Sequence, residues 1–250
     1  MKRIFYCLAF LFTINSCKAE KINPNKTDAD SIRQPFFAGQ FYPADSTKLA
    51  NQIKVFIENA KPSKVDNAIA IIVPHAGYIY SGQIDADAYN QVKQNKYDLI
   101  VVLGTNHTTA GFSGISVFPK GAFVAPIGAA EIDNKAAEEL LKEDDEVTTN
   151  LAVHAKEHSI EVQIPFIKYL FPHAKILPII VGEPDIGMCT RFGKALASVF
   201  KDKKTLIVAS SDLSHYPSFN DAIEVDNKTL KTIAGLNPKR DYFGNAKSDG

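Results

Sequence analysis

The sequence predicts a single α/β domain in which a mostly parallel central sheet carries helices on both faces. The first observation is a set of continuous apolar runs without polar alternation, the pattern of strands that are buried on both faces. The second is that these runs alternate with segments of helical spacing, which favours parallel pairing through crossover connections. The third is that three runs end in polar turns that carry histidine, at the strand ends where open α/β sheets bind ligands.

The predicted strands are short runs rich in Ile, Val and Leu. The first, residues 68–73, runs into Pro74, which cannot donate a hydrogen bond to a sheet and should end the strand. Gly77 then frees the backbone for a sharp turn. We interpret this run as a central strand, and residues 121–128 as a loop. The other predicted strands are residues 98–104, 114–118, 175–181 and 205–209.

The predicted helices lie between these strands. Leu49 and Ile53 fall on one helical face, after a cap at Asp45 or Ser46. A long helical pattern at residues 155–171 contains Pro165, which should kink the helix or delay its start. The remaining predicted helices span residues 81–93, 134–142, 190–200 and 222–236.

The first residues have the layout of an export signal. A basic start precedes an apolar run that is too short to span a bilayer. Residues 14–17 resemble a bacterial lipoprotein signal, which predicts cleavage before Cys17 and a lipid on its sulfur; the alternative is an ordinary signal peptide. We therefore divide the chain into a signal at 1–17, a polar, flexible tether at 18–32 and a domain at 33–250. The predicted location is the bacterial cell envelope, with a membrane anchor on Cys17.

The composition bears on which partners and which disulfides are expected. The 28 basic residues balance the 28 acidic ones, so the charge gives no reason to expect a nucleic acid. We expect a small molecule or a peptide as ligand, and membrane contact only through the lipid. If Cys7 is removed with the signal and Cys17 is acylated, only Cys189 remains. No internal disulfide is then expected.

Polar side chains follow three of the predicted strands. His75 follows the first, His107 follows the second, and Asp212 and His215 follow the last. The carboxyl ends of parallel strands share one edge of a sheet, so these side chains are expected to converge in one crevice. Two histidines and a carboxylate with open positions are typical of both non-haem iron and zinc sites, and the residues do not choose between them. A histidine that does not bind the metal is a candidate general acid or base.

A further polar cluster, the motif EHSIE at residues 157–161, begins a predicted helix. The positive end of that helix is expected to face the same crevice. For these side chains the alternative is a turn-stabilising or capping role, except for His215, which could instead pack with Tyr216 as a surface pair. His154 and His173 belong to no pattern, and we predict that both are surface residues.

Several motifs, in order and in spacing, resemble the Memo family, whose bacterial members are called AmmeMemoRadiSam system protein B. The motifs are VPHAGYIYSG, LGTNH, EHSIEVQIPF, PIIVG and ASSDLSHY, and FFAGQFYPAD is similar to the opening motif of the family. The resemblance covers residues 33–237. The family is similar in fold to the class III extradiol ring-cleaving dioxygenases, which bind non-haem iron at the strand ends of an α/β domain.

The resemblance implies a metal site with catalytic side chains around it. The implied metal ligands are His75, His107 and Asp212. The implied catalytic residues are His158, His215 and Glu161. Iron is the expected metal, with copper and zinc as alternatives. The implied function is metal-dependent redox or dioxygenase-like chemistry. The alternative is a non-catalytic adaptor that binds a peptide or a small anion in the same crevice.

Two features depart from the family pattern. Family members carry a Cys-Gly motif beyond the helix that follows SSDLSH, and its cysteine is counted among the metal ligands. No such motif precedes Gly250, so we expect either a longer natural chain or a site that lacks one ligand. The second departure is the export signal, because many family members are cytoplasmic.

Overall fold

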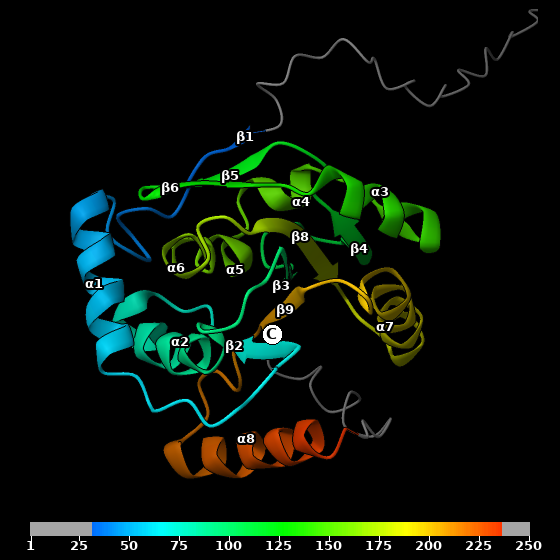
Figure 1. The fold of residues 1–250 in the computed structure, drawn as a ribbon. Coiled ribbons are helices and arrows are strands. Elements are labelled where there is room, and N and C mark those ends of the chain that lie inside the picture. Colours follow the sequence, from blue (N-terminus) through cyan, green and yellow to red (C-terminus); the bar gives the residue numbers. More distant parts are fainter. Residues whose placement is uncertain (1–31, 237–250) are drawn as a thin grey trace, which may run out of the picture.

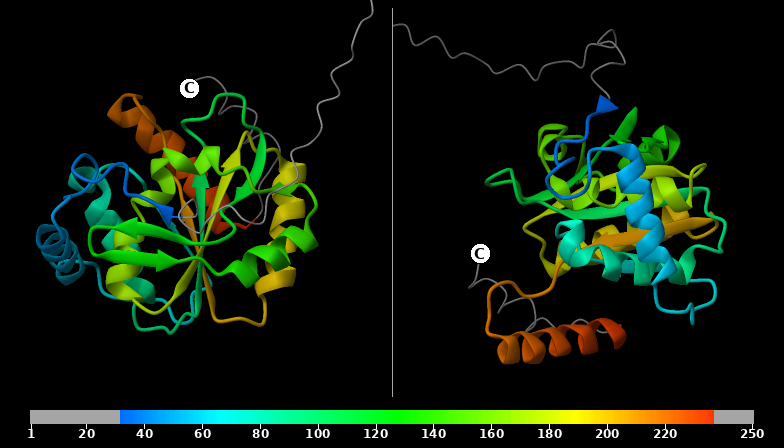
Figure 2. Two further views of the ribbon diagram at one scale, coloured as in Figure 1. Left: turned by 90° about the horizontal axis from the view of Figure 1, so that it is seen from above. Right: turned by 90° about the vertical axis from the view of Figure 1, so that its left-hand side faces the viewer.

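The structure, a computed structural model, describes residues 32–236. The predicted signal, the lipidation site at Cys17 and almost all of the tether lie outside the described residues. A six-stranded sheet forms the middle layer, and helices cover both of its faces (Figures 1 and 2). This confirms the predicted fold class. Among residues 32–236, no helix is long and apolar enough to cross a membrane.

The main sheet has the strand order β2-β9-β3-β8-β4-β7. Its first four strands run parallel, whereas β4 runs antiparallel to β8 and pairs with β7 in parallel. The strands are β2 (Ala70–Val73), β3 (Leu99–Thr105), β4 (Gly114–Val117), β7 (Val147–Thr148), β8 (Lys175–Gly182) and β9 (Thr205–Ser210).

A second, small sheet corrects the prediction of a loop over residues 121–128. It contains β1 (Ile32–Arg33), β5 (Ala122–Ala125) and β6 (Gly128–Glu131), and the last two strands form a hairpin. Four-residue strands are too short to show a clear period in the sequence. The partner of β5 on its other side, β1, lies some ninety positions earlier in the chain, so no local signal announces the pairing.

The helices lie close to their predicted positions, but several begin earlier than predicted: α7 (Ile186–Phe200) by four residues and α8 (Phe219–Ala234) by three. The pattern over 155–171 forms two short helices, α5 and α6, instead of one, and Pro165 stands in the first turn of the second. Helix α2 begins three residues before its predicted start. Asp45 caps α1 as predicted, with its side chain accepting from the Lys48 amide at 2.8 Å. The helices are α1 (Ser46–Glu58), α2 (Tyr78–Val92), α3 (Asn134–Glu143), α4 (Ala152–Ala155), α5 (His158–Glu161), α6 (Ile164–Leu170), α7 (Ile186–Phe200) and α8 (Phe219–Ala234).

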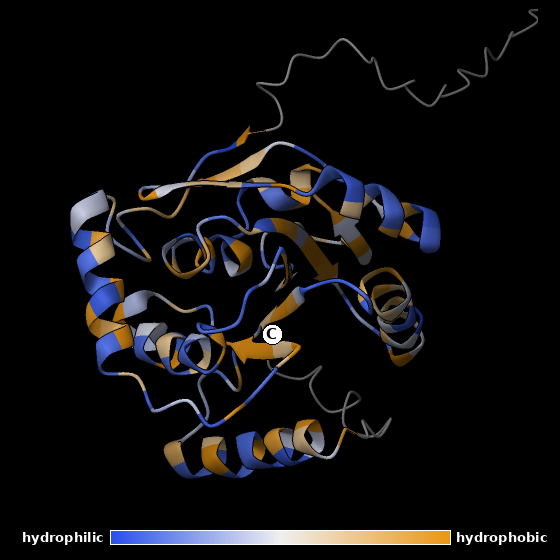
Figure 3. Cartoon of the chain, in the orientation of Figure 1, coloured by the Kyte–Doolittle hydropathy of each residue, from blue (hydrophilic) through white to orange (hydrophobic). Residues whose placement is uncertain are grey.

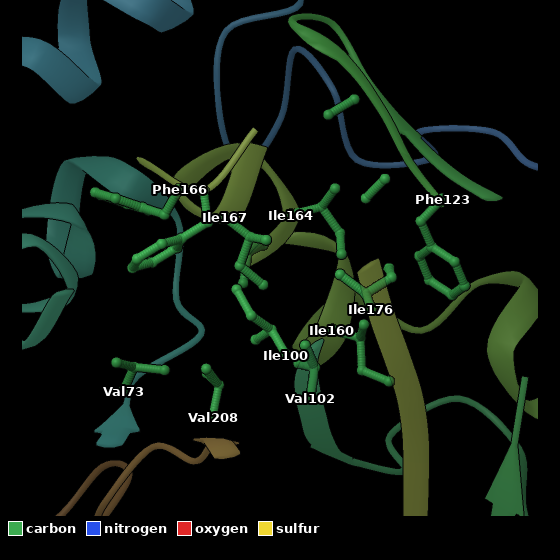
Figure 4. Close-up of a cluster of buried hydrophobic side chains, with 14 of the residues drawn as sticks. Val73, Ile100, Val102, Phe123, Ile160, Ile164, Phe166, Ile167, Ile176 and Val208 are labelled. Carbon is green, nitrogen blue, oxygen red and sulfur yellow. The ribbon is translucent and has the colours of Figure 1, made fainter. Parts of the chain in front are cut away.

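The core is divided between the two faces of the sheet. Alternate residues of β3 point to opposite faces: Ile100 and Val102 pack with α1, α2, α5 and α6, whereas Leu99 and Val101 pack with α3 and α7. The inner strands are the most hydrophobic part of the molecule (Figure 3). Figure 4 shows the first of these clusters, in which Phe166 and Ile167 of α6 lie over the sheet.

Strand β2 corrects another expectation. We predicted a central strand at residues 68–73, but β2 stands at the edge of the described sheet. Only Val73 is fully buried, while Ile72 remains 47% exposed. An apolar run indicates that a strand packs against the core. It does not show whether the strand pairs with one neighbouring strand or with two. The last of the described strands, β9, lies between β2 and β3. It therefore takes the inner position that we expected for β2.

This topology brings the three predicted strand ends together. Val73 at the end of β2 is paired in register with Ser210 at the end of β9, and Leu103 of β3 is paired with Ala209. The turns that follow β2, β9 and β3 therefore leave the sheet side by side, at the same edge.

Candidate metal centre

Three histidines meet at this edge of the sheet. His75, His107 and His158 can each offer one ring nitrogen such that all three atoms lie within 4.8 Å of one another. Their ring centroids are 4.5–5.4 Å apart. In a tetrahedral zinc site with Zn–N bonds of about 2.0–2.1 Å, ligand nitrogens are about 3.4 Å apart. Small side-chain rotations would close the remaining gap, so the donor set fits a transition-metal ion.

Two of the three histidines are delivered by strand ends, as predicted. His75 follows β2, and its ring is almost fully buried. His107 lies two residues after β3, with its side chain 35% exposed. The third, His158, is the first residue of α5 and comes from above the sheet. The site is thus buried at His75 and accessible to solvent at His107.

A glycine in β3 allows α5 to approach the sheet. A Cβ atom on Gly104 would lie 2.5 Å from Oγ of Ser159 and 2.6 Å from Cγ1 of Ile160, which is closer than real contacts allow. With glycine at this position, the Ser159 hydroxyl donates to the carbonyl oxygen of Thr105 at 2.9 Å. Because glycine has no side chain, α5 can lie close to β3, and this determines how near His158 is to the strand ends.

The Glu157 carboxylate contacts two of the histidines. Its carboxylate is 1% exposed; Oε1 lies 3.0 Å from Nδ1 of His107 and 3.2 Å from Nδ1 of His158. The backbone amides of His107 and Ser159 also donate to this carboxylate. Burial alone would raise the pKa of Glu157, but these hydrogen bonds lower it to about 2, so the group is ionised at neutral pH.

The three imidazoles respond differently to this environment. Burial lowers the pKa of His75 to about 4, against the opposing field of Asp212. Burial also lowers the pKa of His158, although Glu157 opposes the shift. The hydrogen bond with Glu157 raises the pKa of His107. His75 and His158 are thus neutral near pH 7, the form that binds metals.

Asp212 and His215 lie beside the three histidines, in the loop after β9. Oδ1 of Asp212 accepts the backbone amide of His75 at 2.7 Å. Its Oδ2 lies 3.8 Å from Nε2 of His75 and 3.4 Å from Nε2 of His215. The side chain of His215 is 55% exposed. The structure therefore places Asp212 against the histidine group and His215 farther out, towards solvent.

Glu161 is placed differently from the other predicted site residues. It forms a buried ion pair with Arg33, and it accepts the amides of Phe36 and Phe37 and the hydroxyl of Tyr42. Both carboxylate oxygens are thus occupied within the protein. The arrangement ties the opening segment of the domain to the turn that carries His158.

Arg33 completes this connection from the other side. Its Nε donates to the carbonyl oxygen of His154 at 3.1 Å, and its Nη2 donates to that of Glu157 at 2.9 Å. The rings of Phe37 and Phe41 also pack against the ring of His158, with centroids 5.6 and 5.0 Å away. The opening segment therefore forms one wall of the site.

His154 corrects a prediction, because it is not a surface residue. It is 1% exposed, with Nε2 3.2 Å from Oγ of Ser116 and its ring packed near Phe118. Burial lowers the pKa of His154 to about 3. A lone histidine outside any motif carries no signal in the sequence for a partner 38 residues away.

Sequence reasoning missed the buried polar groups that support the site. We had no role for Arg33, Gln163 or Ser210. A signal existed for Ser210, because it is the last residue before the polar turn of the final strand. Arg33 stands more than 120 residues away from the groups it binds, and nothing in the local pattern indicates such a contact.

Comparison with known proteins places the chain in a family. A family model described as Memo-like protein matches residues 33–248. A MEMO1 family protein of Methanobrevibacter smithii is 35% identical over 218 residues, covering 82% of this chain and 77% of the relative. Similar proteins from Sulfurisphaera tokodaii and Aquifex aeolicus are 37% and 38% identical, covering 83% and 85% of this chain and 78% of each relative. Because the family model matches most of the chain and these relatives exceed 30% identity, the chain belongs to the Memo family.

Proposed function

We propose that this protein binds a divalent transition metal through His75, His107 and His158 and uses it in redox or dioxygenase-like chemistry. The observation that supports the proposal is the convergence of three ring nitrogens within 4.8 Å. Imidazole suits iron, copper and zinc. Iron is our first choice, because the resemblance to the extradiol dioxygenases implies it; the ligand set itself fits iron, copper and zinc. A bound redox-active ion would supply one-electron and dioxygen chemistry.

Asp212 is our candidate for a fourth ligand. Its Oδ1 is already engaged by a backbone amide, whereas Oδ2 lies 3.8 Å from Nε2 of His75. Together with the charge on Glu157, a carboxylate at this position would balance the two positive charges of the ion. Removal of Asp212 should therefore weaken binding, but by less than removal of any of the three histidines.

His215 is our candidate for proton transfer at the exposed side of the site. Its Nε2 lies 3.4 Å from Oδ2 of Asp212, and it is open to a ligand from solvent. A histidine at this place is a candidate general acid or base. We assign Glu161 a structural role, because its oxygens are occupied by Arg33, two amides and Tyr42.

Metal titration tests the proposal. The protein is purified without added metal, analysed for bound elements, and titrated with Fe²⁺ under anaerobic conditions and with Zn²⁺. His75→Ala, His107→Ala and His158→Ala should each weaken binding by roughly tenfold or more. The matched control is His173→Ala, since His173 is exposed and is not part of the three-histidine cluster.

The same titration separates the alternative function. Wild-type affinity in the His158→Ala variant would contradict the three-histidine site. A protein that binds no metal, but still captures a peptide or a small anion after treatment with a chelator, would favour the adaptor role.

The cell-envelope location is proposed separately, from the sequence of residues 1–17. Mass spectrometry of the mature amino terminus should find a lipid on Cys17. An unmodified terminus farther along the chain would exclude a lipoprotein.

A further inference from the structure

The hydroxyl of Ser210 has one proton, and the structure shows where that proton is used. Ser210 is 3% exposed, and its Oγ donates to the carbonyl oxygen of Ser159 at 2.6 Å. Nε2 of Gln163 donates to the same Oγ from 3.2 Å. The remaining contact of Oγ, 3.2 Å to Nδ1 of His75, is a hydrogen bond only when Nδ1 carries the proton. The proton count therefore fixes the tautomer of His75.

Gln163 is itself held in this orientation. Its Nε2 also donates to the carbonyl oxygen of Pro74 at 2.7 Å, and its Oε1 lies 3.2 Å from the hydroxyl of Tyr89. The amide is fully buried, and reversing it would set its oxygen against the carbonyl oxygen of Pro74, one acceptor against another. Oγ of Ser210 thus stays an acceptor toward His75.

Glu157 determines the tautomer of the other two rings. An ionised carboxylate only accepts hydrogen bonds. Nδ1 of His107, 3.0 Å from Oε1, must therefore be the protonated nitrogen. Nδ1 of His158 faces the same oxygen at 3.2 Å, which favours a proton there as well.

We propose that Ser210 and Glu157 are positioning residues that hold all three histidines as Nδ1-protonated tautomers. The Nε2 atom of each ring is then the free donor that faces a metal. The inference rests on the proposed metal-binding function for its purpose. The tautomers themselves exist before any metal binds, so they can be measured independently of it. Histidine ligands in proteins are commonly oriented by such a bond to their other nitrogen.

Nuclear magnetic resonance of the metal-free protein tests this directly. Histidine side chains are labelled with ¹⁵N, and long-range ¹H–¹⁵N correlations at about pH 8.5, where neutral rings predominate, identify the protonated nitrogen of each ring. The rings are assigned from the spectra of the matching His→Ala variants. We expect His75, His107 and His158 to carry the proton on Nδ1. A proton on Nε2 of His75 or His107 would overturn the inference.

Two variants separate the two positioning residues. Ser210→Ala should change the tautomer of His75 and leave that of His107 unchanged. Glu157→Gln should change His107 and His158 and leave His75 unchanged. A general loss of structure would disturb all three rings alike. If Glu157→Gln does not fold, the Ser210→Ala spectrum decides alone: a His75 signal identical to that of the wild type contradicts the proposal.

Zn²⁺ titration connects the tautomers to the site. Ser210→Ala and Glu157→Gln should each lower the Zn²⁺ affinity by about 10–100-fold. The matched control is Asp144→Asn, which removes another buried carboxylate, one bound to Arg191 and outside the site. This control should change neither the tautomers nor the affinity.

If the wild type shows the expected tautomers but binds no Zn²⁺, the proposed function fails and the positioning role stands. Normal Zn²⁺ affinity in both positioning variants would refute that role.

Discussion

The turn at residues 157–161 and the loop at residues 211–218 both bring a histidine to the same edge of the sheet, but only the turn is buried. Glu157, Ser159 and Glu161 of the turn are each about 1% exposed or less. The loop is exposed along most of its length, with Tyr216 at 99%, and no residue of the following helix α8, all of which is described, is buried. One half of the site is therefore built into the core, and the other lies on the surface.

Burial determines how each half of the site can contribute to function. Buried polar groups keep one geometry because every alternative leaves a donor or acceptor unpaired. The exposed loop has water as an alternative partner and can adjust to a ligand. We therefore expect substitutions in the turn to change stability and metal binding together. Substitutions in the loop should change binding or activity with little effect on folding.

Breaking the buried ion pair should have the largest effect. Arg33→Met leaves Glu161 buried without its cation and should lower the free energy of unfolding by about 3–5 kcal/mol. Urea denaturation followed by circular dichroism measures this. Lys54→Met is the matched control, because its ion pair with Glu58 is 60% exposed on both sides and should change stability by less than about 1 kcal/mol. Equal effects in the two variants would mean that burial does not increase the contribution of the Arg33–Glu161 pair to stability.

Gly104→Ala should come next. The added methyl group meets Ser159 and Ile160, so α5 must shift, which costs about 1–3 kcal/mol and displaces His158. The metal affinity should fall in parallel, as measured by Zn²⁺ titration. A control is available in α7, where a Cβ atom on Gly193 would meet nothing within 4 Å. Gly193→Ala should be neutral or stabilising, with unchanged affinity. A stable Gly104→Ala protein would show that the close approach is not required.

The buried His154, in α4 just before the turn, makes the folded protein sensitive to acid. Burial lowers its pKa in the folded state to about 3, with Arg33 lowering it further and Glu157 and the bond to Ser116 opposing, whereas the unfolded value is about 6.5. The unfolded state therefore binds the proton first, and stability present above pH 6.5 is lost as the pH falls towards 3. This residue should contribute a loss of about 2 kcal/mol between pH 7 and pH 5.

Unfolding free energies of the wild type and of His154→Phe at both pH values measure this contribution. The difference between the two proteins isolates His154 from the other histidines. Parallel pH curves would mean that His154 is not the group responsible.

The smallest effect is expected in the exposed loop. His215→Ala removes a half-exposed side chain and should change the unfolding free energy by less than about 0.5 kcal/mol. Thermal denaturation and Zn²⁺ titration of the same sample should both remain close to the wild type. A large loss of stability would mean that the loop, like the turn, contributes to folding, and would contradict the distinction between them.

The two halves also differ in how far the sequence predicted them. The strand ends at His75, His107 and Asp212 were found from apolar runs that stop at polar turns, because that signal is local. The edge position of β2 was not found, because strand order depends on where β9 enters the sheet. The turn was recognised as a polar motif, but its role depends on Arg33 and Gly104, which lie far away in the sequence.

X-ray absorption spectroscopy of the metal-loaded protein tests the central claim most directly. Imidazole rings give a scattering pattern that counts the histidines bound to the absorbing ion. We expect three imidazoles on Zn²⁺ or Fe²⁺ in the wild type and two in His158→Ala. A wild-type spectrum with one imidazole or none would contradict the three-histidine centre.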